Sequence, residues 1–354
     1  MTEPPATQAP ERRNLADADL TRAVEASFDG TPDPRLREIL QSLVRHLHAF
    51  ASEVALTEEE WFAGIDFLTR TGHITDDKRQ EFILASDTLG LSMLVIGINH
   101  RHATGATEST VFGPFFVEGS PAFENGDDLA NGAPGMPCFM SGTVRSTSGE
   151  PIPGALLDIW QADEDGLYDV QYDDLDEARG RGHLHSDDEG RYWFWTVQPE
   201  AYPIPTDGPV GSMLGATNRS PMRPAHVHFR VTAPGYQTLT THVFDESDQY
   251  LDTDAVFGVR SSLLATFDHH EPGPAPDGRE MTEPWRSAAE AQASGARIRS
   301  NCALRHGSVI SRPSGAVPAS WCSKVASSEL RTPKTASVSR YSSASSKTWV
   351  MRVW

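Results

Sequence analysis

One segment of the chain carries two imidazoles at a spacing that suits a metal ion. The segment 223–231 reads Arg-Pro-Ala-His-Val-His-Phe-Arg-Val, and its apolar and polar residues alternate as in a β-strand. Side chains two residues apart on a strand share a face, so His226 and His228 project together. Imidazole is the commonest metal ligand in proteins. The same spacing also fits two polar residues on a solvated face, so this segment alone leaves both interpretations open.

Two tyrosines occur where the local sequence restrains the backbone. Tyr168 follows Asp-Gly-Leu just past an apolar run, and therefore lies at the end of a predicted strand. Tyr202 lies in Ala-Tyr-Pro-Ile-Pro-Thr-Asp-Gly-Pro, where three prolines stiffen the chain. Each tyrosine taken singly also fits a packing role. Taken with His226 and His228, they offer two phenolates and two imidazoles to one ion.

This donor set selects among metals. Phenolate is a hard oxygen donor that suits a highly charged ion, whereas soft sites use thiolate, and ferrous oxygenases use two histidines and one carboxylate. A tyrosine ionises at neutral pH only when the metal stabilises the anion, because its ordinary pKa is about 10. The pattern therefore favours ferric iron. His183 and His185 form a second alternating pair before Asp187, but they lack rigid flanking residues, and we do not expect a metal there.

Two kinds of sequence must position these side chains. Residues 15–110 read as helical, and in 35–54 apolar residues recur at three- and four-residue steps. Thr57 followed by Glu60 predicts a capping box at the start of the next helix. Downstream, short alternating runs between Gly, Pro and Asp turns predict an antiparallel β-sandwich over 111–283. The predicted fold class is therefore α+β, with a helical region for packing and dimerisation; a lid is the alternative role for these helices.

Charge and composition exclude several classes of protein. The net charge is −19, but residues 284–354 contain 11 Lys/Arg and 2 Asp/Glu, a net of +9, which leaves −28 for residues 1–283. So acidic a body argues against a nucleic-acid surface. No apolar run is long enough to span a bilayer, and the three cysteines form no Cys-x-x-Cys motif. We therefore expect a cytoplasmic protein with no transmembrane segment and no nucleic-acid partner.

Three motifs, in order along the chain, resemble those of the intradiol ring-cleavage dioxygenases. They are Gly-Leu-Tyr ending at Tyr168, Tyr-Pro-Ile-Pro-Thr-Asp-Gly-Pro-Val-Gly beginning at Tyr202, and Arg-Pro-Ala-His-Val-His-Phe beginning at Arg223. The resemblance implies one non-haem Fe(III) bound by Tyr168, Tyr202, His226 and His228. It also implies catalytic roles for Tyr202, as a base released from the metal, and for Arg223. A homodimer through N-terminal helices is typical of the catechol 1,2-dioxygenase branch of this family.

Finer features resemble the hydroxyquinol 1,2-dioxygenases within that branch. They lie in 111–116, 240–244 and 250–259. The resemblance implies cleavage of hydroxyquinol (1,2,4-trihydroxybenzene) by O2, giving 3-hydroxy-cis,cis-muconate and its tautomer maleylacetate, in the degradation of aromatic compounds. Catechol or chlorocatechol is the alternative substrate, and a non-enzymatic β-sandwich binding module is the alternative of another class. By position, the implied substrate-binding residues are Leu84, Asp87, Val111, Gly113, Pro114, Phe115, Ile204 and His242.

Two of these residues bear on which ring the site accepts. Asp87 is an unusual side chain for an aromatic pocket, and a third ring hydroxyl would give it a hydrogen-bond partner. Catechol enzymes of this family usually carry Gln where His242 stands. Arg223 is implied to stabilise negative charge on the reacting substrate. Asp87 also fits a solvated helix residue, and Arg223 also fits a structural ion pair in an acidic body.

The resemblance covers residues 20–283 and suggests four parts of the chain. They are a loose N-terminus at 1–14, a helical dimerisation and linker region at 15–110, the catalytic β-sandwich domain at 111–283, and a tail at 284–354. The tail is basic and contains 16 Ser in 71 residues. Such a composition predicts disorder, and the abrupt change favours translation out of frame. An evolved basic tail is the alternative. The family closes its sheet with a further strand, which we expect to be missing here.

Overall fold

The computed structural model describes residues 16–76, 79–100, 106–172, 175, 177–290, 292–293, 296–297 and 301–304. The described residues fall into two compact units, which meet in sequence between His46 and Leu47. The first holds helix α1 and the start of helix α2, and the second holds the remaining helices and all the strands.

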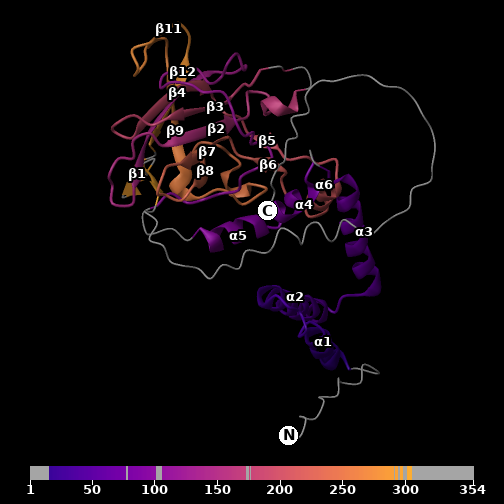
Figure 1. Ribbon diagram of the computed structural model, residues 1–354. Coiled ribbons are helices and arrows are strands. Elements are labelled where there is room, and N and C mark those ends of the chain that lie inside the picture. The colour runs from indigo at the N-terminus through magenta and orange to yellow at the C-terminus, as the bar shows by residue number, and fades with distance from the viewer. Residues whose placement is uncertain are drawn as a thin grey trace, which may run out of the picture. The chain divides into compact units, whose positions relative to one another are not determined.

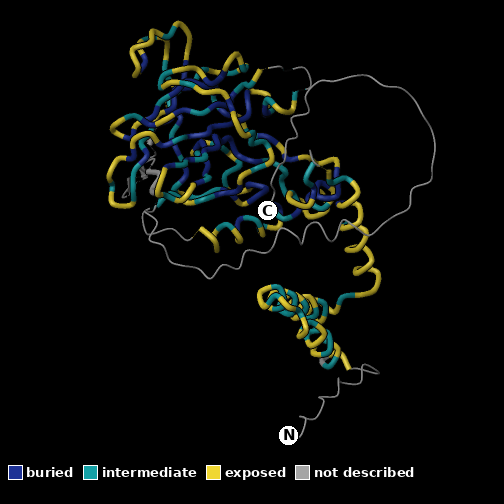
Figure 2. Tube along the Cα trace, viewed as in Figure 1, coloured by how far each residue is buried: buried dark blue, intermediate teal, exposed yellow. Residues whose placement is uncertain are grey.

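Helices α1, Asp17–Ala26, and α2, Pro34–Glu53, agree with the predicted amphipathic pattern. Asp33 accepts hydrogen bonds from the first N–H groups of α2, and Pro34 occupies its first turn, which explains why the helix begins there. Within the first unit, Arg45 of α2 pairs with Glu25 of α1. Figure 2 shows exposed and intermediate residues alternating along α2, and Ile39 and Leu43 of its apolar stripe are exposed.

Helix α3, Glu58–Ile74, begins at the predicted capping box. Thr57 Oγ1 accepts the N–H of Glu60 at 3.2 Å, and the Glu60 carboxylate accepts the N–H of Thr57 at 2.9 Å. Helices α4, Glu81–Thr88, and α5, Leu91–Asn99, follow. None of the described helices is long and apolar enough to cross a membrane by itself, and α4 with α5 meets that test only as a pair bent by 79°.

A nine-stranded sheet dominates the second unit, in the order β15-β1-β12-β9-β8-β7-β2-β3, with β4 also paired to β1 (Figure 1). Its strands are β1 Pro137–Ser146, β2 Leu156–Gln161, β3 Arg181–His185, β4 Arg191–Val197, β7 His226–Thr232, β8 Leu239–Asp245, β9 Leu264–His270, β12 Trp285–Glu290 and β15 Asn301–Leu304. Strand β1 runs parallel to β12 and β15, and β8 runs parallel to β9. The sheet is therefore mixed, which corrects the predicted antiparallel β-sandwich. Alternation along a strand reveals its buried face but carries no information on the direction of its neighbours.

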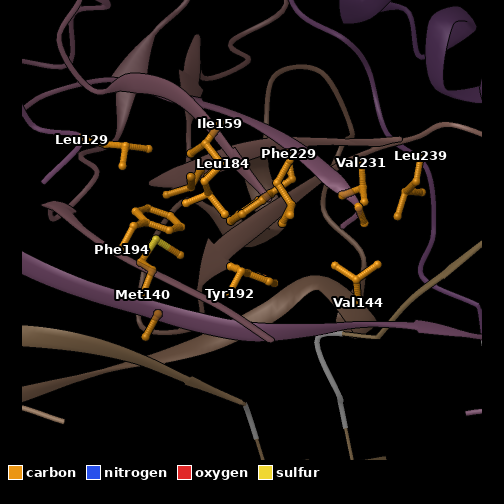
Figure 3. Packing of buried hydrophobic residues seen from close by; sticks show 14 of the residues in the cluster. Leu129, Met140, Val144, Ile159, Leu184, Tyr192, Phe194, Phe229, Val231 and Leu239 are labelled. Carbon is orange, nitrogen blue, oxygen red and sulfur yellow. The ribbon is translucent and has the colours of Figure 1, made fainter. Parts of the chain in front are cut away.

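The sheet curves around one hydrophobic core. Side chains from both ends of the strand order meet there, including Val144 of β1, Phe194 of β4 and Leu184 of β3 (Figure 3). Phe229 of β7 joins them from the middle of the sheet. Figure 2 shows that buried residues concentrate in this region. Because protein cores are close-packed, the strands around it form a stiff base for side chains that leave the sheet on its other face.

The remaining elements are short. They are helix α6 Pro209–Ala216, the paired strands β5 Tyr202–Pro203 and β6 Met222–Arg223, the pair β10 Gly273–Pro274 and β11 Glu280–Met281, the pair β13 Gln292–Ala293 and β14 Ala296–Arg297, and the 3₁₀ turns η1 Asp169–Gln171, η2 Leu251–Thr253 and η3 Ser261–Leu263. Helix α4 contacts α3, α5 and α6.

The sheet extends beyond the predicted end of the catalytic domain. Strand β12 lies between β1 and β9, with Trp285 opposite His270. Trp285 is buried and stacks on the His270 ring, with the ring centroids 4.1 Å apart. A closing strand is therefore present in the first residues of the predicted tail, so the expectation that it is missing is wrong; the predicted domain boundaries themselves stay a prediction. The weakly alternating sequence Trp-Arg-Ser-Ala-Ala-Glu concealed this strand, and most of the predicted tail lies outside the described residues.

Candidate metal centre

Strand β7 places two imidazoles on one face of the sheet. His226 and His228 are both about fully buried, at 1% exposure, and their Nε2 atoms lie 3.2 Å apart. The register pairs His228 with Trp160 of β2 on one side and with His242 of β8 on the other. Directly opposite residues on neighbouring strands share a face, so Trp160 and His242 flank the His228 ring. The Trp160 ring stacks on it at a centroid distance of 4.6 Å.

Tyr168 reaches the same place from the loop that follows β2. The Asp163 carboxylate accepts the N–H groups of Asp165 and Leu167, which closes this loop into a tight turn. Gly166 has a φ of +73°, and a Cβ at this position would lie 2.9 Å from the Cβ of Tyr202. The turn therefore needs glycine both for its left-handed backbone and for close packing against the second tyrosine.

Tyr202 is held by a two-stranded pair outside the large sheet. Strands β5 and β6 set Tyr202 directly opposite Arg223. The Arg223 guanidinium then lies 3.4 Å from Tyr202 Oη and 3.2 Å from His226 Nε2. Since Arg223 precedes β7 by only three residues, the same short segment supplies an arginine and both histidines.

Four donor atoms converge. Tyr168 Oη lies 3.0 Å from His228 Nε2, 3.5 Å from His226 Nε2 and 3.4 Å from Tyr202 Oη. The structure therefore brings together all four predicted ligands from three separate parts of the chain. Two phenol oxygens and two imidazole nitrogens in one buried space match the donor preference of a hard, highly charged ion.

The hydrogen bonds at the Nδ1 atoms of His226 and His228 determine whether their Nε2 atoms carry a proton. His226 Nδ1 lies 2.7 Å from the carbonyl oxygen of Pro224, which accepts only from a protonated Nδ1. His226 Nε2 therefore keeps its lone pair for the shared space. His228 Nδ1 lies 2.7 Å from His242 Nε2. When His228 Nδ1 donates its proton to this hydrogen bond, His228 Nε2 is unprotonated as well. Such contacts behind a ligating imidazole set its tautomer and its orientation.

Burial tunes the protonation of the same groups. It lowers the pKa of His226 and of His228 well below the ordinary value, and the positive charge of Arg223 adds to the effect, so both rings are neutral at pH 7. Burial, followed by the neighbouring Tyr202, raises the pKa of Tyr168 well above its ordinary value. Neutral imidazoles are ready to bind a metal, whereas the Tyr168 phenolate needs the charge of a metal ion to form.

A cluster of three histidines is also present, because His242 lies within 4.8 Å of His226 and His228. His242 Nε2 faces the Nδ1 of His228, however, and not the space shared by the tyrosines. Its position favours a role in orienting His228 over the predicted contact with substrate. Two candidate donor sets therefore share His226 and His228: one adds His242, and the other adds Tyr168 and Tyr202.

Arg223 is buried, at 4% exposure, and is anchored on one side only. Its Nε donates to Asp254 at 3.2 Å, and Asp254 also accepts the N–H of Gly258 at 2.7 Å. The second terminal nitrogen of Arg223 has no hydrogen-bond partner in the described part of the chain. Although burial alone would lower its pKa, the nearby Tyr202 and Asp254 raise the pKa of Arg223, so it stays charged. The ion-pair interpretation and the catalytic one are thus compatible, since one guanidinium edge serves Asp254 and another faces the site.

Comparison with known proteins agrees with this geometry. The family model described as "Dioxygenase" matches residues 111–283, and the one described as "Catechol dioxygenase N terminus" matches residues 33–107. The hydroxyquinol 1,2-dioxygenase of Nocardioides simplex is 57% identical over 75% of this chain and 91% of its own length. The chain belongs to the intradiol ring-cleavage dioxygenases. This membership excludes the binding-module alternative.

Two further relatives support the same assignment. The 6-chlorohydroxyquinol 1,2-dioxygenase of Cupriavidus pinatubonensis is 59% identical over 69% of this chain and 89% of its own length. The crystal structure of hydroxyquinol 1,2-dioxygenase from Pseudomonas putida has a TM-score of 0.73 and 50% identity, covering 77% of this chain and 96% of that one.

Three of the predicted substrate residues of this dioxygenase share one apolar cluster. Leu84, Val111 and Ile204 lie in or against one apolar cluster from α4, the segment before β1 and the loop after β5. Motifs did not point to Met93, Ile96 and Leu214 of that cluster, whereas its members Ala255 and Val256 lie in the segment 250–259. The cluster as a whole draws on α4, α5, the segment before β1, the segment 204–214 and the segment 255–256, so only the tertiary fold shows that these residues share one wall.

The segment Gly113-Pro114-Phe115 lies directly against the ligands. Gly113 has a φ of +74°, and a Cβ there would lie 3.1 Å from the ring of His228. Phe115 stacks on the ring of Tyr168, with centroids 4.4 Å apart and planes inclined by 25°. The backbone can approach the His228 ring this closely in a left-handed conformation because Gly113 has no side chain.

Asp87 is not a solvated helix residue. It lies on α4 and is 8% exposed, and burial raises the pKa of its carboxyl group, while a hydrogen bond with Ser92 and the charge of Arg223 oppose this. A buried carboxyl group with few partners is a candidate for pairing with a polar ligand.

Two other features do not contribute to the centre. His183 Nδ1 contacts the carbonyl oxygen of Ser120 at 2.8 Å, and His185 is exposed; that this pair binds no metal stays a prediction. A groove of 560 Å³ runs along α5, but its described lining residues include none of the predicted substrate-binding residues. Its lining residues are Leu89, Gly90, Met93, Leu94, Gly97, Ile98, Phe257 and Arg260.

Sequence reasoning missed several supporting residues. Trp160 covers His228, Asp254 anchors Arg223, and Arg181 pairs with Asp169 beside Tyr168. The only available signal was that Asp254 lies in one of the motifs and Asp169 directly follows Tyr168. Their partners lie on other strands, and one sequence carries no record of such pairing.

Proposed function

We propose that this dioxygenase cleaves hydroxyquinol between its adjacent 1- and 2-hydroxyls with O2, at a non-haem Fe(III) bound by Tyr168, Tyr202, His226 and His228. The product would be 3-hydroxy-cis,cis-muconate, which tautomerises to maleylacetate. The observation that carries the proposal is the convergence of two phenol and two imidazole donors in a buried space, where Tyr168 Oη lies 3.0–3.5 Å from each of the other three donor atoms. The relatives named hydroxyquinol 1,2-dioxygenase support the choice of substrate.

The donor chemistry supports the ferric state. Two phenolates supply two negative charges to one ion, which a trivalent ion balances better than a divalent one. The described part of the site offers no thiolate that would favour a soft metal, since Cys138 lies in the hydrophobic core. Bound there, ferric iron supplies a Lewis-acidic centre at which two adjacent ring oxygens bind and the ring becomes reactive towards O2.

The two tyrosines are suited to different tasks. Tyr168 is fully buried, and Phe115 and Tyr202 both lie against its ring, so it is held as a permanent ligand. Tyr202 is 8% exposed and belongs to the two-residue strand β5, outside the large sheet. We therefore assign to Tyr202 the role of a base, whose phenolate oxygen would take up a substrate hydroxyl proton.

Arg223 is assigned to stabilise negative charge on the substrate. Asp254 holds its Nε, which leaves the unpartnered nitrogen with a fixed direction. A buried, preoriented cation is most effective where charge develops during a reaction, because no solvent reorganisation is needed.

Asp87 is assigned to recognise the third hydroxyl of hydroxyquinol. Because its pKa is raised, the buried carboxyl group can be protonated and donate a hydrogen bond, and its oxygens can also accept one. A site built to pair with a substrate hydroxyl disfavours an analogue that lacks it, by up to about 10⁴-fold. The site would accordingly favour hydroxyquinol over catechol.

We further propose that the enzyme is a cytoplasmic homodimer that pairs through its N-terminal helices. The support for pairing is apolar surface: Trp61, Phe62 and Leu68 of α3 are each more than half exposed, in a helix whose sequence predicts a buried apolar face. Sedimentation of the wild type and of Phe62→Glu tests this. The wild type should sediment as a dimer, and the variant should dissociate into monomers at higher protein concentration than the wild type does. A monomeric wild type would reject the proposal.

Oxygen uptake by iron-loaded protein tests the substrate assignment. Hydroxyquinol and catechol are compared at matched concentrations, with correction for the autoxidation of hydroxyquinol, and Asp87→Ala should narrow the difference between them. Faster turnover of catechol would move the assignment to the catechol 1,2-dioxygenases. An extradiol aldehyde product, or full activity with zinc alone, would reject the ferric site.

A further inference from the structure

A buried ion pair lies directly behind the ligand Tyr168. Asp169 is the next residue in the chain, and Arg181 reaches it from strand β3. Their side chains are only 3% and 7% exposed. Arg181 Nε lies 2.9 Å from one carboxylate oxygen, and a terminal nitrogen contacts the other. Because desolvating two charges offsets most of their attraction, a buried ion pair is a poor source of stability, and its geometry is the more informative feature.

The same guanidinium makes a third contact. Arg181 donates from its other terminal nitrogen to the carbonyl oxygen of Phe115 at 2.7 Å. The Phe115 ring is the one that stacks on Tyr168 at 4.4 Å. The Arg181 side chain therefore holds both Asp169, which directly follows Tyr168, and Phe115, whose ring covers Tyr168. The planar fork of arginine permits these three directions at once, which a lysine ammonium does not reproduce.

Strand β3 offers a stiff attachment for this side chain. Arg181 lies opposite Trp160 of β2 in the register, and Trp160 is the residue that stacks on His228. The two positions thus belong to one paired stretch of the sheet, which supports a histidine ligand through Trp160 and a tyrosine ligand through Arg181.

We propose that Arg181 is a positioning residue for the iron site: through Asp169 and Phe115 it sets the place and tilt of the Tyr168 phenol ring. This inference rests on the proposed ligation of iron by Tyr168. A displaced phenolate overlaps less well with the ion, so loss of Arg181 contacts should weaken iron binding and alter the phenolate-to-iron absorption that gives such a site its colour.

Arg181→Lys tests the inference, because it keeps the charge and removes the fork. Arg286→Lys of β12 is the matched control, since Arg286 likewise donates to a backbone carbonyl, that of Phe267 at 2.8 Å, but in the sheet away from the ligands. Iron affinity is measured by competition with a chelator, and the visible absorption is recorded at full iron occupancy. Arg181→Lys should bind iron about 10-fold more weakly, with a shifted and weaker band, and Arg286→Lys should match the wild type.

The outcomes separate the two proposals. A wild type that binds no iron, or is colourless when loaded with ferric iron, rejects the proposed function and with it this inference. A coloured wild type with an Arg181→Lys variant of unchanged affinity and spectrum rejects the inference alone. If Arg181→Lys is not recovered in folded form, Asp169→Asn, which preserves side-chain volume, decides by the same two measurements.

Discussion

Replacing Tyr168 by Phe should separate iron binding from folding. The change removes one oxygen and leaves the ring, which packs between Phe115 and Tyr202. In the metal-free protein, burial keeps this phenol protonated, and its shortest hydrogen bond is the one to His228 Nε2 at 3.0 Å. Loss of one neutral hydrogen bond lowers the free energy of unfolding by about 1 kcal/mol.

The effect on iron should be much larger, because a direct ligand is lost. Even residues behind a ligand typically contribute about 10–100-fold to metal affinity. We therefore expect Tyr168→Phe to weaken iron binding by more than about 100-fold, which corresponds to about 2.7 kcal/mol. The visible absorption should fall, since one of two phenolates is gone, and nearly all activity should be lost.

Tyr172→Phe is the matched control. It is the same chemical change four residues away, and it removes a 2.7 Å hydrogen bond to Asp163, the contact that raises the pKa of Tyr172 to about 12. That contact is part-buried, and the loss of one such hydrogen bond should also cost about 1 kcal/mol. Urea unfolding of the two metal-free variants should then give similar stabilities, while chelator competition and absorption differ. If Tyr168→Phe keeps the wild-type iron affinity and colour, Tyr168 is not a ligand and the four-donor site is wrong.

Three further predictions concern the groups around the ligands. His242→Gln should keep the wild-type iron affinity, because the amide oxygen can accept a hydrogen bond from His228 Nδ1, whereas His242→Leu should bind iron about 10-fold more weakly. Competition with a chelator measures both affinities, and equal values would contradict a role of His242 in orienting His228. In Asp254→Asn the buried Arg223 loses its charged partner, so the free energy of unfolding should fall by up to about 3 kcal/mol, and kcat should fall by a larger factor than KM rises. Unchanged steady-state kinetics would contradict the role of Asp254 in anchoring Arg223. Burial raises the folded-state pKa of Asp87, so the folded state holds this proton more tightly than the unfolded state does. The stability that proton binding adds to the folded state is complete below the unfolded pKa of about 3.9, and it is lost as the pH rises through the folded pKa. Metal-free Asp87→Asn should therefore gain stability relative to the wild type as the pH rises from 4 to 7 in urea unfolding, and a constant difference would show that the pKa is not raised.

The sequence by itself determined the residues that can do chemistry. Alternation around His226 and His228 identified a strand with both imidazoles on one face, which β7 has. The three prolines around Tyr202 and the Asp-Gly turn before Tyr168 are local signals, and the structure places both phenols at those histidines. These features could be read because strand faces, helix caps and turns depend on residues only a few positions apart.

The tertiary structure alone decided which residues support them. The register between β7 and β8 sets His242 behind His228, and the pairing of β2 with β3 brings Arg181 beside Trp160. Strand β12 inserts between β1 and β9, where its weak alternation had concealed it. A period of two reveals the face of a strand but neither its partner nor its direction, and these depend on how distant strands close around the shared core.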